Sequence, residues 1–191
     1  MKTGRIWIVV LIATFSWLGF RIAVGQLNAF DYMKSQPFGV AANLLLLLLA
    51  IAYTLYTTYS KEVQVRSYFD DFKLAMKTGI AYTVLMGMMF VGYYSYSTDM
   101  SLKRSNDMVQ IEQSLDTPEE LLAAQNENEA LKDLTKEQIQ QSLIERVNTM
   151  TSVKIITTIG VAGTVLSTLV YALILPAIFR NLLLKEVNQS E

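Results

Sequence analysis

The sequence predicts an all-α protein: an integral membrane four-helix bundle with a helical extracytoplasmic insertion between its third and fourth spans. Three observations carry this prediction, namely four long apolar stretches, the lack of charge inside three of them, and one long acidic segment. About 20 helical residues at about 1.5 Å each cross a hydrocarbon core of about 30 Å. A hydrophobic content of 52 % also occurs in soluble domains, so its concentration into blocks decides the fold class.

The chain is expected to form a single membrane domain, residues 1–191. The last three apolar stretches contain no charged residue, which is typical of membrane-spanning helices. The predicted spans cover about residues 6–25, 38–60, 78–98 and 155–179.

The first span is interrupted by a charge, because Arg21 follows an uncharged run of apolar residues. A cleaved signal peptide is the alternative, since Lys2 and Arg5 would form its positive start. No small-x-small cleavage pattern follows closely, so we expect an uncleaved anchor. Arg21 is then expected to extend its guanidinium to the lipid headgroups at the membrane surface; the alternative is a functional buried charge.

Basic residues in the short flanks predict the orientation. Eight of them fall on one side of the predicted membrane: Lys2, Arg5, Lys61, Arg66, Lys73, Lys77, Arg180 and Lys185. That side should be cytoplasmic, which places both termini inside. The segment 99–153 then lies outside, and its part from Asp99 to Arg146 carries eleven acidic and five basic residues.

The acidic insertion contains two helix-start patterns. Thr117-Pro118-Glu119-Glu120 and Thr135-Lys136-Glu137-Gln138 both have the spacing of a capping box. After the second pattern, Ile139, Leu143, Val147 and Met150 recur on one helical stripe, and this helix could continue directly into the fourth span. The insertion is expected to be a solvated surface whose stripe packs on a neighbouring helix or on the membrane; the alternative is a docking surface for a larger partner.

Small and polar residues inside the spans are expected to pack the helices together. Close approach of backbones at such residues drives helix association in lipid, within one chain or between copies. Asn43 should add an interhelical hydrogen bond, whereas groups of tyrosines near the span ends should form interfacial belts. The helix-packing residues are Gly79, Thr83, Gly87, Gly160, Gly163, Thr164, Ser167 and Asn43.

Catalysis finds little support in the sequence. The chain has no histidine and no cysteine, which excludes thiol chemistry, imidazole base catalysis and ordinary zinc sites. Asp70 and Asp71 are adjacent and would diverge by about 100° on a helix, so they do not form a carboxylate pair. We expect no enzyme, no cofactor, no metal and no nucleic-acid partner.

The segment that leads into the third span has its own pattern. Phe69, Phe72 and Met76 recur at helical spacing beside Lys73 and Lys77. They are expected to form an amphipathic turn on the membrane surface, with the lysines among anionic headgroups. This turn is interpreted as the anchor of the third helix; a regulatory lipid sensor is the alternative.

Two short elements resemble a known family. The cytoplasmic loop that enters the third span, Ser67 to Gly79, resembles a "phenylalanine, then alanine, lysine, x, glycine" entry, and Leu134 to Ile139 is similar to a short acidic pre-helix. Both elements resemble those of a bacterial four-helix membrane family labelled domain of unknown function 4199. The family occurs mainly in Bacteroidota. The resemblance implies a bacterial inner (cytoplasmic) membrane protein and supplies no catalytic residues. This chain departs from the family pattern in the charged outer end of its first span.

The sequence therefore predicts a multi-pass inner-membrane protein with a non-enzymatic role, a structural or accessory subunit of a larger envelope complex. Its partners would be the lipid bilayer and a larger membrane complex or further copies of the chain. The alternative is a small permease or channel, which four helices could form only as an oligomer.

Overall fold

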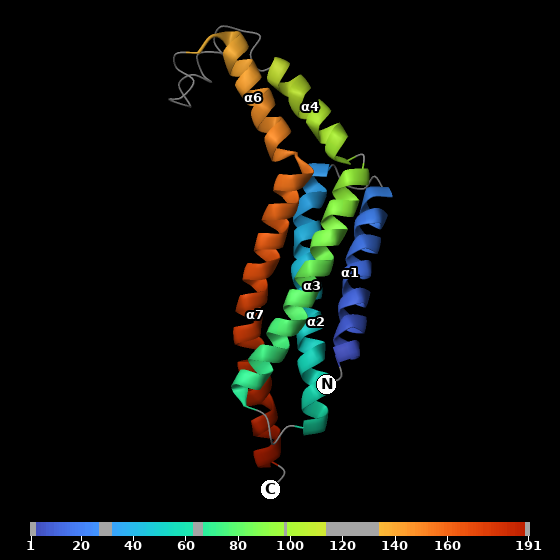
Figure 1. Cartoon of the computed structure of the whole chain (residues 1–191), viewed down its shortest axis with the longest axis vertical. Helices are drawn as coiled ribbons and strands as arrows, with labels where there is room; N and C mark the ends of the chain where they lie inside the picture. The colour runs from blue at the N-terminus through green and yellow to red at the C-terminus, as the bar shows by residue number, and fades with distance from the viewer. Residues whose placement is uncertain (1–2, 27–31, 63–66, 98, 114–133, 190–191) are drawn as a thin grey trace. The chain divides into compact units, whose positions relative to one another are not determined.

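The computed structural model describes residues 3–26, 32–62, 67–97, 99–113 and 134–189. These residues are almost entirely helical and contain no strand, so the protein is all-α (Figure 1). The helices are α1 (Thr3–Gln26), α2 (Tyr32–Glu62), α3 (Tyr68–Tyr96), α4 (Asp99–Gln113), α6 (Lys136–Met150) and α7 (Val153–Gln189).

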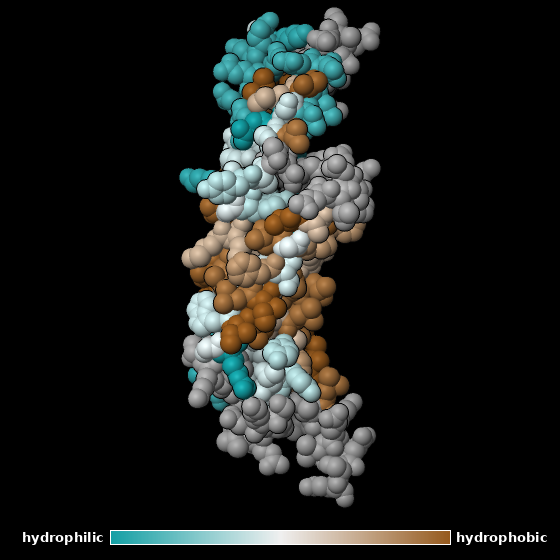
Figure 2. All heavy atoms as spheres, turned by 90° about the vertical axis from the view of Figure 1, so that its right-hand side faces the viewer, coloured by the Kyte–Doolittle hydropathy of each residue, from teal (hydrophilic) through white to brown (hydrophobic). Residues whose placement is uncertain are grey.

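Four of these helices are long and apolar enough to cross a membrane. The candidate spans are Gly4–Val24, Pro37–Tyr59, Tyr68–Tyr96 and Val153–Leu182. Apolar side chains cover the visible face of these helices, as expected for a surface that meets lipid (Figure 2). The protein is therefore an all-α membrane protein with four candidate spans.

The chain divides into two compact units. The bundle unit comprises residues 1–93 and 158–191, and the insertion unit comprises residues 94–157. Within the bundle unit, the start of α1 and the end of α7 lie at the same end of the four helices (Figure 1). Because the bundle has four long helices that alternate in direction, its first helix begins and its last helix ends on the same side.

Each long helix buries one stripe of side chains. The α1 stripe follows the i, i+3, i+4, i+7 spacing of a helix face. It consists of Val10, Ala13, Thr14, Trp17 and Arg21. The α2 stripe repeats the spacing, and it consists of Asn43, Leu47, Ala50, Ile51, Thr54, Leu55, Thr58 and Tyr59. The third helix, α3, buries a further stripe from Asp71 to Phe90, so these three helices contribute most of the bundle core.

The third helix begins earlier than the sequence suggested. The span was expected at about 78–98, but α3 starts at Tyr68, where Ser67 caps it. The Ser67 hydroxyl and the Asp70 carboxylate are 2.8 Å apart, and the Asp70 amide donates to the Ser67 hydroxyl oxygen over 3.2 Å. The segment Phe69 to Lys77 therefore forms the first turns of α3 itself instead of a separate turn before it.

In the insertion unit, α4 and α6 pack against each other. Ile139 is fully buried, and Ile111 of α4 with Leu134 and Leu143 surrounds it. The capping box at the start of α6 is present, with Thr135 accepting from the Gln138 amide and the Gln138 side chain accepting from the Thr135 amide. The other predicted cap, Thr117 to Glu120, lies outside the described residues.

The expectation that α6 continues into the fourth span is wrong. The helix ends at Met150, and Thr151 donates both its amide and its hydroxyl to the Val147 carbonyl. Ser152 then starts α7, because its side chain accepts from the Ile155 amide. Competing bonds from Thr and Ser side chains to the backbone break the helix at this point.

Proline 176 does not end the fourth span, since α7 runs through it to Gln189. The Tyr68 hydroxyl of α3 donates to the Leu173 carbonyl over 2.7 Å, three residues before the proline. This bond joins the start of α3 to α7 just before the proline. The carbonyl that Pro176 leaves without a helix donor is that of Ala172, four residues before it.

Candidate functional site

The middle of the bundle contains a polar contact that joins three helices. Asn43 on α2 donates through its side-chain amide to the Thr164 hydroxyl on α7 over 3.0 Å. The Tyr82 hydroxyl on α3 donates to the Asn43 side-chain oxygen over 2.9 Å. All three residues are buried, so these bonds take the place of the hydrogen bonds that the same groups would make to water. The sequence predicted the bond of Asn43 but not its tyrosine partner.

Arg21 takes a different position from the one expected. Arg21 is 2 % exposed, so it is buried among the helices instead of extending away from them, whereas its depth relative to the headgroups stays a prediction. Its guanidinium carbon lies 5.2 Å from the centre of the Tyr93 ring, a cation–π distance. Gly39 of α2 makes room for it, because a Cβ there would lie 2.9 Å from an Arg21 nitrogen.

Trp17, one turn before Arg21, supports this arrangement. Its indole N–H donates to the Gly39 carbonyl over 3.0 Å. Its ring meets the edges of Phe90 and Tyr93 at centroid distances of 5.0 and 5.8 Å. Three helices, α1, α2 and α3, thus surround the arginine with aromatic side chains and a glycine backbone.

A second buried ionisable group lies at the end of the bundle where α3 begins. Asp71 is 1 % exposed, and its carboxylate accepts from the Tyr59 hydroxyl over 2.6 Å. The Arg180 guanidinium of α7 lies 3.6 Å from the same carboxylate oxygen. The Tyr59 ring stacks on Phe179 with a centroid distance of 6.1 Å. Asp71 therefore connects α2, α3 and α7 through one oxygen atom.

The glycines predicted to pack helices differ in how closely a neighbouring helix approaches them. Gly79 lies directly against the Thr168 side chain, and Gly160 lies against the Phe90 ring, whose nearest atom would be 2.6 Å from an added Cβ. Gly87 lies close to Val161, since an added Cβ would be 3.2 Å from a Val161 methyl carbon, tighter than an ordinary contact. Gly163 differs, because no atom lies within 4 Å of an added Cβ, so it does not pack against the described chain.

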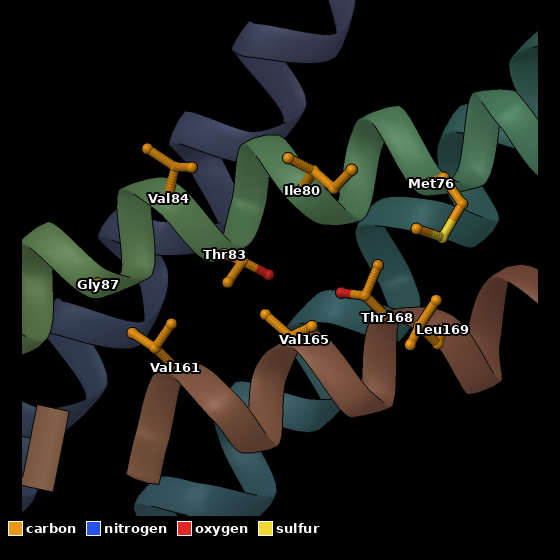
Figure 3. A pocket seen from close by; sticks show the side chains of 9 residues that line it. All are labelled: Met76, Ile80, Thr83, Val84, Gly87, Val161, Val165, Thr168 and Leu169. Carbon is orange, nitrogen blue, oxygen red and sulfur yellow. The ribbon is translucent and has the colours of Figure 1, made fainter. Parts of the chain in front are cut away.

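An apolar groove of about 480 Å³ runs between α3 and α7 (Figure 3). The α3 side chains come from every third or fourth residue, and the α7 side chains face them. Two threonines belong to the lining, and the hydroxyl of Thr83 donates to the Gly79 carbonyl over 2.8 Å. The lining residues are Met76, Ile80, Thr83, Val84, Gly87, Val161, Val165, Thr168 and Leu169.

The aromatic and basic residues at the start of α3 lie next to this groove in the sequence. Phe69 is exposed and stacks on Phe72 with a centroid distance of 6.3 Å. The Lys73 ammonium lies 4.3 Å from the centre of the Phe69 ring. Lys73 and Lys77 are both exposed, whereas Met76 is half-buried and lines the groove.

Sequence reasoning missed Tyr59, Asp71 and Arg180. Tyr59 was assigned to an interfacial belt, and Asp71 was considered only as a partner for Asp70. A signal for Asp71 exists, because Leu74, Ala75 and Thr78 place it on the buried stripe of α3. Arg21 likewise continues the buried stripe of α1.

Comparison with protein-family models, curated protein sequences and solved structures finds no match to the chain. The chemistry of the site therefore has to be judged from its geometry. In the described bundle, the threonine hydroxyls bond mainly to their own helix, whereas Trp17, Asn43, Tyr59, Tyr68 and Tyr82 bond to other helices. The groove between α3 and α7 offers apolar surface. Such an arrangement suits the packing of helices and the binding of an apolar partner.

Proposed function

We propose that this protein is a non-enzymatic accessory subunit that binds a larger membrane complex. The observation that carries the proposal is the free face of α7 around Gly163. An added Cβ at Gly163 meets nothing within 4 Å, and Ser167 lies one turn further on the same face. Small residues four apart allow a second helix to approach closely in lipid.

The surroundings of Gly163 support the same proposal. Ile159 and Leu166 beside it are 64 % and 65 % exposed. The α7 span is also the least buried of the four, with 28 % of its most apolar stretch covered by the rest of the chain. A helix with this much exposed apolar surface and with two small residues four apart has the features of a helix–helix contact site.

We further propose the bacterial cytoplasmic membrane as the location, with both termini inside and α4 and α6 outside. The positive charge of the short flanks supports this orientation. Membership of the family labelled domain of unknown function 4199 is part of the same proposal. Its two supporting elements correspond to the starts of α3 and α6.

The test is purification of the tagged full-length protein in mild detergent at its natural expression level, followed by mass measurement of the eluted complex. Gly163→Leu fills the free face of α7. Gly19→Leu is the matched control, because Gly19 on α1 is equally open. We expect a stoichiometric partner that Gly163→Leu loses and Gly19→Leu retains. A homo-oligomer alone, or a partner retained by both variants, would contradict the proposal.

A small oligomeric permease is the second candidate, and the buried ionisable groups favour it. Charged side chains within membrane helices often mark ion or substrate pathways. Arg21 and Asp71 are 2 % and 1 % exposed, at different levels of the bundle. Flux in liposomes that Asp71→Asn abolishes, with the helix content of the variant unchanged, would favour this candidate over the accessory subunit.

A further inference from the structure

We propose that the groove between α3 and α7 binds one acyl chain of an anionic phospholipid, whose phosphate is held by Lys73 and Lys77. The site does not include Gly163, so it is independent of the proposed partner contact. Nothing in it requires a chemical reaction. The proposal combines the shape of the groove with the charge at one end of it.

The groove has the surface chemistry of a chain-binding site. Its volume of about 480 Å³ lies within the range of about 300–1,000 Å³ that is typical of small-molecule pockets. Thr83 and Val165 point toward each other between α3 and α7, and the hydroxyl of Thr83 already donates to the helix backbone (Figure 3). The Thr168 hydroxyl is the lining group that makes no hydrogen bond within the described residues. The rest of the surface suits an alkyl chain, whereas a strongly polar ligand would lose most of its hydrogen bonds to water without replacement.

Contacts between the same two helices lie beyond both ends of the groove. The Tyr68 hydroxyl bonds the Leu173 carbonyl beyond Met76 and Leu169. Phe90 packs on Gly160 beyond Gly87 and Val161. These contacts hold α3 and α7 together on either side of the groove. A preformed groove of this kind binds a chain without first ordering the protein.

The basic residues lie on the face of α3 that carries the groove. Lys73 is seven residues before Ile80, and Lys77 is seven residues before Val84, so each stands two helical turns from a lining residue. Both lysines are exposed. A lipid chain that enters the groove at Met76 would therefore bring its headgroup to two ammonium groups.

The acids nearest to these lysines have other partners. The Asp70 carboxylate accepts from the Ser67 amide and is 2.8 Å from its hydroxyl. The buried Asp71 carboxylate is bonded to Tyr59 and paired with Arg180. The Lys73 ammonium lies over the Phe69 ring. This cation–π contact holds the charge near the start of α3, beside the apolar groove. The lysine charges are thus available to a phosphate.

The test is native mass spectrometry of the full-length protein with added phosphatidylglycerol or phosphatidylcholine carrying the same chains. The wild type should bind the anionic lipid about 25-fold more tightly, since each lysine contributes about fivefold. Lys73→Gln with Lys77→Gln should remove this preference and should weaken phosphatidylcholine binding much less, because the choline already neutralises that phosphate. Lys103→Gln with Lys154→Gln changes the charge equally at other sites and should keep the preference.

The acyl-chain part is tested by filling the groove. Val165→Trp should weaken binding of both lipids at least tenfold, whereas Leu166→Trp, which adds the same ring to an exposed position outside the groove, should not. Ile80→Trp fills the groove from the α3 wall, so one misfolded variant does not prevent the test. Equal affinity for both lipids in the wild type would overturn the proposal. So would lipid binding that neither groove variant changes, or a protein helix found in the groove.

Discussion

Single residues in this protein show how burial changes the role of a polar side chain. Arg21 and Asp71 occupy positions at which a membrane helix could place a charge in the headgroup region, yet both are buried. Each is surrounded by groups that suit its charge: aromatic rings for the arginine, and a tyrosine hydroxyl with a guanidinium for the aspartate. A buried charge with such partners is costly to create and strongly destabilising to disrupt.

The hydrogen bond between Tyr59 and Asp71 should contribute measurably to stability. Tyr59→Phe removes the hydroxyl and keeps the ring that stacks on Phe179. We expect a loss of about 1.5–3 kcal/mol in the free energy of unfolding, the usual value for a hydrogen bond to a charged group. Tyr56→Phe is the control, because Tyr56 on the same helix is 59 % exposed. Equal unfolding midpoints of the two variants in one detergent would contradict the role of the bond.

At the scale of the helices, small residues decide which helices approach closely. Gly79 brings the α3 backbone against Thr168 of α7, and Gly39 brings the α2 backbone against Arg21 of α1. The same residue type at Gly163 faces open space. A glycine in a span therefore marks a close approach only where another helix is present to use it.

This difference predicts opposite outcomes for two identical substitutions. Gly79→Ala places a methyl group against the Thr168 side chain and should destabilise the bundle by about 1–3 kcal/mol through overpacking. Gly163→Ala meets no neighbour and should leave the unfolding midpoint of the isolated protein unchanged or slightly raised. Adding Thr168→Ala to Gly79→Ala should recover part of the loss. Similar midpoints for the two single variants would argue against the α3–α7 contact.

The start of α6 predicts a pH dependence. The backbone amide of Glu137 and the Thr135 hydroxyl lower the pKa of the Glu137 carboxyl below its ordinary value. Because the pKa is lower in the folded helix than in the unfolded chain, the charged form stabilises α6 above the unfolded pKa. This contribution is lost as the pH falls through the folded pKa, which lies below the ordinary value of a glutamate.

Hydrogen exchange of the α6 amides measures this effect in the full-length protein. Protection of the first turn of α6 should fall in the wild type as the pH drops below the ordinary pKa of a glutamate, after correction for the intrinsic exchange rate. Glu137→Gln should remove this additional fall, and Glu145→Gln, a change at an exposed position later in α6, should keep it. A pH profile that Glu137→Gln leaves unchanged would exclude Glu137 as its source.

At the scale of the whole molecule, the protein consists of a membrane bundle unit and a polar helical unit between two of its spans. The start of α1, the start of α3 and the end of α7 belong to one end of the bundle (Figure 1). The orientation of this bundle in the membrane is a prediction from the positive charge of the flanks.

The absence of cysteine from the sequence makes this orientation easy to test. Ser142→Cys places a thiol at an exposed position of α6, and Ser67→Cys places one at the start of α3. In intact cells, a membrane-impermeant maleimide should label Ser142→Cys and should label Ser67→Cys only after the membrane is opened. The reverse pattern would show that the bundle is inverted.

Four apolar blocks and their charged flanks determined the membrane class and the four spans, because span length and hydrophobicity are local properties of the chain. The capping box at Thr135 was predictable for the same reason. The break at Ser152 was not predicted. The Ser152 side chain accepts a hydrogen bond from the Ile155 amide in place of a helix carbonyl, and the sequence around it also suits a continuous helix.

Tertiary structure alone decided which polar groups meet. Asn43 and Thr164 are 121 residues apart, and Asp71 and Arg180 come from different helices, so no local pattern links them. The rotation of each helix about its axis sets these contacts, and it depends on packing against all neighbours at once. The sequence by itself therefore determined the four candidate membrane spans, whereas the buried charges and the groove between α3 and α7 arose only from the assembled bundle.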